Sequence, residues 1–348
     1  MKPRPYFGRG FFSRMMKPFL FLFFVSTFMA CAPDTHIEFE HTGLAQGSTY
    51  QIKYVHTKNM ELQTEIDRVF AEIDNSMNAW MPESIISRLN ADSNWVVADK
   101  HFLAVLDRSR EIAEETNGQF DPTLGPLIQL WGFGYDEVRG DISEKNIMEK
   151  KALTGMDKVD QDGNRIRLKP GSSIDFNAIA QGYTVDMLAE LLEDKGIKRY
   201  MVEVGGEIRA RGLNIKNLEW AIGVDKPNEQ IIAGNRFQFI LRLNNAALAT
   251  SGSYRKFWVD EETGIRYSHT IDPKTGRPAL NRLLSASIIA SNAMDADAYA
   301  TVCMVKGVEE CIEFLNSKAD LEGYLVYSNN DDTWGEYITA GFKIYVVE

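Results

Sequence analysis

The sequence has few of the residues that bind transition metals or cross-link a chain. Its 348 residues include three cysteines and five histidines, and the histidines at positions 36, 41, 56 and 101 form no cluster. The HExxH pattern of many zinc enzymes and the GxSxG pattern of serine hydrolases are both absent. Because a zinc site needs several ligands at defined spacings, the sequence argues against a zinc hydrolase.

The chain also lacks a long apolar run after residue 31 and an excess of positive charge in its body. No stretch there approaches the roughly 20 apolar residues that a membrane-spanning helix needs. The whole chain carries a net charge of −11, and residues 1–30 carry five cations and no acid, which leaves −16 for residues 31–348. An acidic body repels phosphate, so the sequence predicts no nucleic-acid partner. A phosphate-rich ligand would need a metal cation or backbone amides.

Residues 1–30 have the features of an export signal. A basic segment precedes the apolar run FLFLFFVSTFMA, and the small residue Ala30 precedes Cys31. The pattern resembles a bacterial lipoprotein signal with Cys31 as the lipidated residue, although Phe28 stands where leucine is usual. The alternative is plain secretion with cleavage nearby. We expect a lipid-anchored membrane protein on the periplasmic side of the cell envelope, with residues 31–45 as a short tether.

Segments of helical and strand periodicity are mixed irregularly along the rest of the chain. Helical spacing of apolar residues covers residues 60–77, 100–116, 179–197 and 294–306. Strand-like alternation appears between these helices, as in STYQIKYV. Mixing without regular alternation predicts an α+β fold rather than a doubly wound parallel sheet. We expect residues 119–134 to form a loop with bulky anchors.

Two cysteines remain in the body of the chain. Cys303 and Cys311 lie eight positions apart in a probable helical region. Because that spacing does not favour a disulfide, we expect two buried thiols.

Asp297 and Thr301 are a candidate pair of metal ligands. They lie four residues apart in an expected helix and therefore on one face of it. Carboxylate and hydroxyl oxygens are ligands of the kind that Mg²⁺ takes, with water and substrate phosphate completing its shell. On spacing alone, an aspartate near a helix start and a threonine packed in the helix is the simpler interpretation.

The glycine-rich segments VGGE and TSGSYR and the lone His269 are ambiguous by themselves. Neither segment has the G-x-G-x-x-G fingerprint between a strand and a helix, so a Rossmann site is not supported. His269 is the only histidine after residue 101, and it lies three residues before Asp272. Such a histidine is usually structural or solvent-exposed unless a substrate hydroxyl reaches it.

Seven segments taken together resemble the FAD:protein FMN transferase family, ApbE. They occur in the family order over roughly residues 45–305 and are MNAWMPESIISRLN, FDPTLGPLIQLWGFG, IDFNAIAQGYTVD, VEVGGEIRARG, ATSGSYR, YSHTIDPKTGRP and DADAYAT. A lipoprotein signal before them also fits the family. The resemblance implies an ApbE-like domain over residues 46–348, with mixed, mainly antiparallel sheets and flanking helices in two fused lobes.

The resemblance implies an enzyme that splits FAD at its pyrophosphate and requires Mg²⁺. Such enzymes transfer the FMN part to a threonine hydroxyl of a flavoprotein subunit and release AMP. Acceptors in the family include subunits of sodium-pumping NADH:quinone oxidoreductase and of Rnf-type complexes. Two alternatives are an Mg²⁺-dependent FAD pyrophosphatase, with water as acceptor, and a non-catalytic lipid-anchored FAD-binding protein.

The resemblance also assigns roles to individual residues. The implied metal ligands are the carboxylate of Asp297, the hydroxyl of Thr301 and the backbone carbonyl of Ala178. Positions implied to contact FAD are Gln119, Phe120, Asp121, Asp175 and the backbone of Ile271. His269 matches the residue implied to act as the base toward the acceptor threonine.

Three implied FAD-site positions depart from the family pattern. Gln46 stands where methionine is usual, Trp80 stands where tyrosine is usual, and Gln181 stands where lysine is usual. A tryptophan can still stack on a flavin ring, so Trp80 preserves an aromatic surface. Gln181 removes a cation from the neighbourhood expected for the phosphates.

Overall fold

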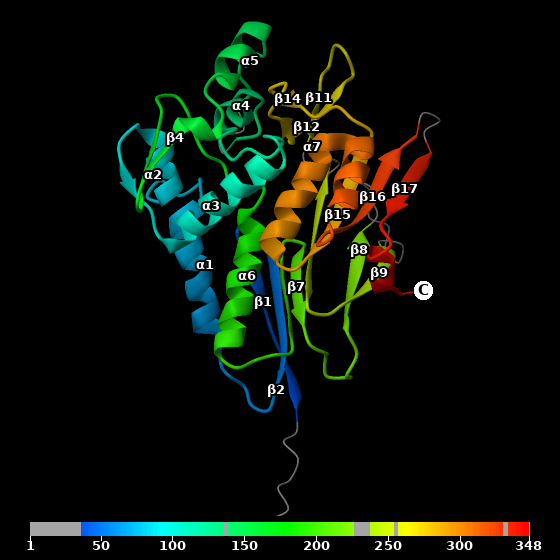
Figure 1. Ribbon diagram of the computed structural model, residues 1–348. Coiled ribbons are helices and arrows are strands. Elements are labelled where there is room, and N and C mark those ends of the chain that lie inside the picture. Colours follow the sequence, from blue (N-terminus) through cyan, green and yellow to red (C-terminus); the bar gives the residue numbers. More distant parts are fainter. Residues whose placement is uncertain (1–35, 135–137, 226–236, 254–256, 330–332, 348) are drawn as a thin grey trace, which may run out of the picture. The chain divides into compact units, whose positions relative to one another are not determined.

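An antiparallel sheet of eight strands organises the fold (Figure 1). The computed structural model describes residues 36–134, 138–225, 237–253, 257–329 and 333–347. In order across the sheet, the strands are β1 (Ile37–Ala45), β2 (Ser48–His56), β6 (Tyr200–Val204), β7 (Glu207–Arg211), β10 (Ala246–Gly252), β15 (Leu283–Ala290), β16 (Glu322–Ser328) and β17 (Trp334–Ile338). Every neighbouring pair in this sheet is antiparallel. The predicted α+β class is confirmed.

The expected tether over residues 31–45 was wrong for residues 37–45, which form the edge strand β1. This strand pairs with β2 along its whole length, from Ile37 opposite His56 to Ala45 opposite Ser48. The two are joined by a two-residue turn in which Gln46 and Gly47 have φ of 51° and 73°. Such a turn matches the right-handed twist of a hairpin, and it allows the β1 backbone to satisfy its hydrogen bonds within the sheet. Residues 1–30 and Cys31 lie outside the described residues.

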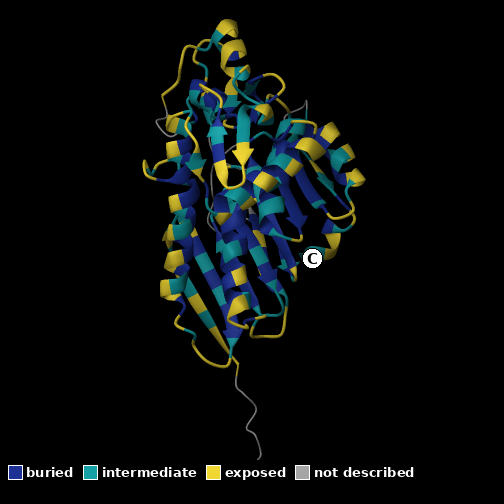
Figure 2. Cartoon of the chain, turned by 60° about the vertical axis from the view of Figure 1, so that its left-hand side comes forward, coloured by how far each residue is buried: buried dark blue, intermediate teal, exposed yellow. Residues whose placement is uncertain are grey.

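Both faces of the central strands of the large sheet are buried. One face packs against the helices α1 (Gln63–Met77), α6 (Ala180–Asp194) and α7 (Ala293–Ser317), and α3 (Lys100–Glu115) adds residues to the same apolar core. The other packs against a three-stranded sheet of β8 (Trp220–Asp225), β9 (Phe237–Leu243) and β18 (Val346–Val347). Figure 2 shows the buried residues in dark blue along the strands and the exposed residues in yellow on the outer sides of the helices.

Strand β10 shows how the alternation of side chains divides the interior. Ala247 and Ala249 belong to the core under the helices, whereas Ala246 and Leu248 belong to the core under the small sheet. Successive side chains of a strand point to opposite faces, so a strand buried on both faces is apolar throughout. Small residues on the helix side let α7 pack close to the sheet.

Smaller elements surround this framework. Antiparallel pairing joins β3 (Val96–Val97), β4 (Val159–Asp162) and β5 (Arg165–Leu168), then β11 (Phe257–Val259) with β12 (Arg266–Ser268), and β13 (Ile271–Asp272) with β14 (Arg277–Pro278). The remaining helical turns are α2 (Ile85–Ala91), α4 (Gly125–Leu130), α5 (Glu144–Lys151), and the 3₁₀ turns Met156–Lys158 and Phe342–Tyr345.

The segment 119–134 is not the simple loop that its sequence predicted, because it contains helix α4. Pro126 lies in the first turn of α4, where its fixed φ is compatible with a helix and its missing N–H is not needed. Leu127 and Leu130 are buried against Trp131, so a single apolar face stabilises this short helix.

The prediction of two free thiols was wrong, because Cys303 and Cys311 form a disulfide. Eight residues of straight helix would separate their Cα atoms by about 12 Å. The separation is 5.0 Å because α7 is broken at Gly307, whose φ of 74° and ψ of −173° are not helical. Glycine accommodates this conformation, and the chain turns back far enough for the cysteines to meet.

The longer predicted helices are confirmed at α1, α3, α6 and the first part of α7. Helix α6 ends just before Gly196, whose φ of 78° supplies the left-handed residue that commonly follows a helix. None of the helices in the described part of the chain combines the length and apolar character needed to cross a bilayer.

Candidate functional site

The start of α6 and the first turns of α7 meet at Asp297. The carboxylate Oδ2 of Asp297 accepts a hydrogen bond from the backbone N–H of Gly182 at 3.0 Å. Gly182 has no side chain, and a Cβ there would lie 2.2 Å from the carbonyl oxygen of Ala293. The glycine therefore lets two helices approach closely enough for a carboxylate on one to contact the backbone of the other.

Asp297 is a buried carboxylate with no opposite charge beside it among the residues that the structure describes. Its exposed fraction is 6%, and no ion pair joins it to any lysine, arginine or histidine in the described ranges. Burial raises the pKa of Asp297 to about 7, while the hydrogen bond from Gly182 lowers the pKa in part. An ionised carboxylate in such a place is costly unless a cation accompanies it, so the residue fits a metal ligand.

Thr301 lies one turn after Asp297 on α7, and its Oγ1 is 3.3 Å from Oγ of Ser251 on β10. Ala178 lies in the turn that precedes α6, four residues before Gly182. A carboxylate, a hydroxyl and a backbone carbonyl are all hard oxygen ligands, which suits Mg²⁺ rather than zinc. The described residues contain no group of three or more His, Cys, Asp or Glu able to hold a metal ion.

A cavity of about 420 Å³ opens beside the start of α6. Three predicted FAD-site residues, Gln46, Trp80 and Gln181, are brought together in its lining, which also includes Gly47, Ile73, Asp74, Met77, Asn78, Asn177 and Ala180. Trp80 is 58% exposed, so its indole is available to a planar ligand. Trp80 and Asn177 also line a second cavity of about 960 Å³, which includes Asp175.

Hydrogen bonds hold two of these side chains against the framework. Gln46 Nε2 donates to Oγ1 of Thr184 on α6 at 3.1 Å, which ties the β1–β2 turn to that helix. Gln181 Nε2 donates to the carbonyl of Val204 at 3.1 Å, where β6 turns into β7. Gly205 has φ of 61°, and a Cβ on it would lie 1.6 Å from Gln181 Nε2. The side chain of Gln181 therefore packs directly against Gly205, where a larger residue would not fit.

The predicted residues 119–121 lie next to Asp175, because the Asp175 N–H donates to the carbonyl of Pro122 at 2.8 Å. Phe120 is buried in the core under the helices, and Gln119 donates to Glu310 at 3.1 Å. Asp121 accepts hydrogen bonds from the N–H and the hydroxyl of Thr123, and burial raises the pKa of Asp121. The contact of Pro122 with Asp175 joins the two segments, but Gln119, Phe120 and Asp121 are not among the residues that line the two cavities described above.

His269 lies on a separate loop, exposed between the buried residues Ser268 and Thr270. Its ring meets Phe133 edge-on, with the ring centres 6.5 Å apart. Asp272 stabilises the turn that follows His269. Its carboxylate accepts hydrogen bonds from the Lys274 N–H and the Thr275 hydroxyl.

Trp131 and its apolar cluster hold the loop that follows His269. Trp131, which is 1% exposed, donates through Nε1 to the carbonyl of Gly276 at 3.0 Å. The side chain of Ile271 is buried in the same apolar cluster, so only its backbone is left for a ligand. The backbone contact with FAD that the resemblance implies for Ile271 stays a prediction.

Sequence analysis missed several residues at this site. Gly182 and Ser251 contact the two predicted metal ligands, and Asp74 and Asn78 line the cavity beside Trp80. One signal was present: glycine inside a helix costs about 1 kcal/mol relative to alanine, so Gly182 called for a packing reason. The contacts of Ser251 and Asp74 depend on tertiary packing and leave no comparable pattern.

The family model described as the ApbE family matches residues 46–325. The chain belongs to the ApbE family. Among relatives of this family, it is 36% identical to the FAD:protein FMN transferase of Vibrio cholerae over 314 residues, covering 88% of this chain and 92% of that protein. It is 33% identical to the FAD:protein FMN transferase of Escherichia coli strain K12, covering 83% of each.

Solved ApbE structures share the fold. The flavin transferase ApbE from Vibrio cholerae superposes with a TM-score of 0.78 at 34% identity, covering 89% of this chain and 99% of that one. The apo form of the flavinyl transferase ApbE from Pseudomonas stutzeri gives a TM-score of 0.79 at 29% identity, covering 89% of this chain and 97% of that one. The fold predicted from the resemblance is thus confirmed.

Proposed function

We propose that this protein transfers the FMN moiety of FAD to a threonine hydroxyl of a flavoprotein subunit and releases AMP. The observation that carries the proposal is Asp297, a buried carboxylate without a paired cation in the described ranges, held beside the start of α6. The aromatic-rimmed cavity lined by Trp80 and Gln181 opens at the same end of α6. Relatives named FAD:protein FMN transferase match most of the chain.

Asp297, Thr301 and the carbonyl of Ala178 would hold Mg²⁺. When bound, this ion would offset the charge of the FAD pyrophosphate and of the departing AMP phosphate. Such a counter-charge matters here because the body of the protein is strongly acidic. Trp80 would offer its indole to the isoalloxazine ring at the rim of the cavity, and Gln46 and Gln181 would offer neutral polar groups.

His269 is the base toward the acceptor. Its ring takes the proton of the threonine hydroxyl while that oxygen attacks the FMN phosphorus and the bond from this phosphorus to the bridging oxygen breaks. The AMP phosphate leaves with the electron pair of the broken bond. An exposed histidine on an anchored loop suits this role, because the acceptor is itself a protein and must reach the base from solvent.

Two other functions use the same site. In an FAD pyrophosphatase, water would attack in place of threonine and free FMN would be released. In a carrier, FAD would be held without reaction. A carrier would need neither the exposed His269 nor the buried carboxylate of Asp297, because holding FAD without reaction requires no general base and no catalytic cation.

The decisive experiment mixes the purified protein, FAD and Mg²⁺ with a candidate acceptor subunit of the sodium-pumping NADH:quinone oxidoreductase or Rnf type. Intact-mass spectrometry of the acceptor should show an added FMN, with AMP released. The matched control is Asp297→Ala, which should abolish transfer while keeping the fold. Free FMN in place of modified acceptor would identify the pyrophosphatase, and unchanged FAD would identify the carrier.

We also propose a lipid anchor at Cys31 and a location on the periplasmic side of the cell envelope. The support is the basic and apolar leader that ends at Ala30 and Cys31. Ala32 lacks the acidic character of a common inner-membrane retention signal, which favours the outer membrane. Palmitate should label the wild type and not Cys31→Ser, and equal labelling of the two would contradict the anchor.

A further inference from the structure

Asp186 makes a second link between α6 and α7, in which the carboxylate is on α6 and the backbone donors are on α7. It lies on α6, one turn after Gly182, and its exposed fraction is 5%. Its Oδ1 accepts from the N–H of Ala293 at 3.0 Å, and its Oδ2 accepts from the N–H of Met294 at 2.9 Å. These are the first two residues of α7, whose N–H groups have no partner within the helix.

The two helices therefore cap each other. Asp186 on α6 satisfies the first turn of α7, and Asp297 on α7 satisfies Gly182 in the first turn of α6. A carboxylate at a helix N-terminus is favourable for both hydrogen bonding and the helix dipole. Because Asp297 lies one turn after the residues that Asp186 holds, the position of its carboxylate relative to α6 depends on Asp186.

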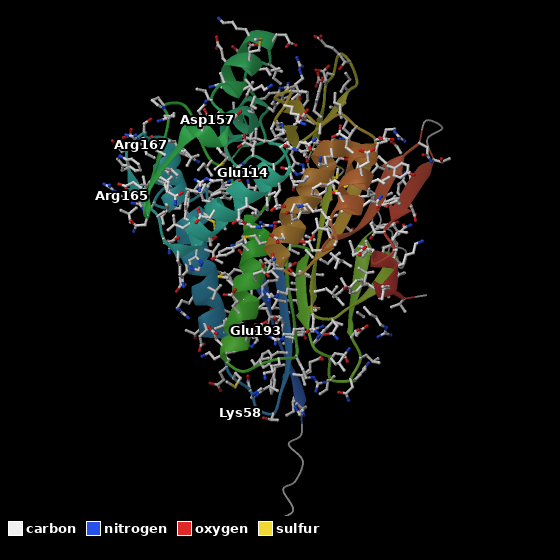
Figure 3. The ribbon with its side chains drawn as sticks, viewed as in Figure 1. Lys58, Glu114, Asp157, Arg165, Arg167 and Glu193 are labelled. Carbon is white, nitrogen blue, oxygen red and sulfur yellow. A yellow bond between two sulfur atoms is a disulfide. The ribbon has the colours of Figure 1, made fainter. Side chains whose placement is uncertain are left out.

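Arg209 on β7 fixes Asp186 in turn. Its Nη1 donates to Oδ1 of Asp186 at 2.9 Å. Its Nη2 lies 3.6 Å from Oε1 of Glu193, which Figure 3 labels near the C-terminal end of α6. The Asp186 carboxylate thus has three donors, two of them backbone amides of another helix. A carboxylate with so many partners has little freedom to move.

We propose that Asp186 is a positioning residue for the cation site, which it serves by holding α7 so that Asp297 faces the start of α6. This inference rests on the proposed function, in which Asp297 binds Mg²⁺. The Asp186 carboxylate already accepts three hydrogen bonds, so Asp186 is not itself a metal ligand. Asn292, the side-chain cap of α7, contacts only residues near its own end of α7, so it does not duplicate the link to α6.

The test measures metal binding apart from catalysis, with Mn²⁺ as the probe. Electron paramagnetic resonance of free Mn²⁺, titrated with metal-free protein, gives a dissociation constant for each variant. Asp186→Asn should weaken Mn²⁺ binding by about tenfold or more, because residues that orient a ligand typically affect metal affinity by that factor. The Mg²⁺ concentration at half-maximal flavin transfer should rise by the same factor.

Asp295→Asn is the matched control. It also replaces a carboxylate by an amide, in the first turn of α7 and close to Asp297 in sequence. Asp295, however, forms an ion pair with Arg108 on α3 and not with a residue of α6. It should lower the melting temperature without moving the Mn²⁺ dissociation constant by more than about twofold. If both variants shift Mn²⁺ binding equally, Asp186 acts as a simple cap or charge and the inference is wrong.

A second variant covers a failure to fold. Asp186→Ser keeps a small polar side chain at this buried position, but its hydroxyl is one bond too short to replace the carboxylate at the N–H groups of α7, so it should weaken Mn²⁺ binding in the same direction. Unchanged binding in a folded Asp186→Ser would also overturn the inference. If the wild type binds no Mn²⁺, the metal assignment of the proposed function fails first, which is a separate outcome.

Discussion

The carboxylate of Asp297 accepts a hydrogen bond from the backbone N–H of Gly182 at 3.0 Å. This contact joins two segments that are 115 residues apart in the chain. It fixes one oxygen of the carboxylate and leaves the other for a cation. The proposed cation site, like the packing of the core, therefore requires the close approach of α6 and α7.

Replacing Gly182 by alanine should separate the two helices. The new Cβ would lie 2.2 Å from the Ala293 oxygen and 2.8 Å from Cβ of Asp297, and the first of these is backbone that yields little. We expect a loss of about 3 kcal/mol in the free energy of unfolding, together with loss of Mn²⁺ binding. Glu190→Ala, on the exposed side of α6, is the control and should change stability by no more than about 0.5 kcal/mol. A Gly182→Ala protein with wild-type stability would contradict the packing described.

Cation binding should depend on pH through Asp297. Burial raises the pKa of this carboxyl to about 7 in the metal-free protein. The metal binds the ionised form, so protons compete with it below pH 7, and the apparent affinity should fall about tenfold per pH unit there. Above pH 7 the affinity should level off. Mn²⁺ titrations across this range provide the measurement, and an affinity that is flat down to about pH 5 would show that Asp297 does not bind the metal.

Replacing His269 by alanine should slow transfer without weakening FAD binding. General-base catalysis is typically worth about 10²–10⁴-fold in rate, and FAD is held by other segments. FAD fluorescence titration and acceptor flavinylation should be measured in parallel, with added imidazole as a rescue. If binding and transfer fall together, or if transfer is unchanged, His269 has a structural role only.

Replacing Trp80 by alanine should weaken FAD binding by about tenfold, because stacking on an aromatic ring contributes on the order of 1 kcal/mol beyond the area it buries. Trp95→Ala is the control: Trp95 is 38% exposed and packs under Arg165 and Arg167, which Figure 3 labels near β4, and it does not line the cavity. Fluorescence titration with FAD measures both variants. If the two variants bind FAD with equal affinity, Trp80 does not contact the flavin.

The sequence by itself determined the α+β class, the long helices and the family. These follow from local periodicity and from motifs whose order is visible along the chain, as in DADAYAT and YSHTIDPKTGRP. The roles proposed for the metal, flavin and base residues came from the resemblance to the family, because Asp297, Thr301 and His269 were ambiguous by type and spacing alone.

Only the tertiary structure decided which of these residues meet. The contact of Asp297 with Gly182, the hold of Asp186 on α7 and the place of Gln181 against Gly205 all join distant segments. The disulfide and strand β1 were mispredicted for the same reason. Cys303 reaches Cys311 only because Gly307 breaks the helix, and residues 37–45 become a strand only because β2 offers them a partner. Hydrogen bonds and packing between segments far apart in sequence leave no periodic signal in either segment alone.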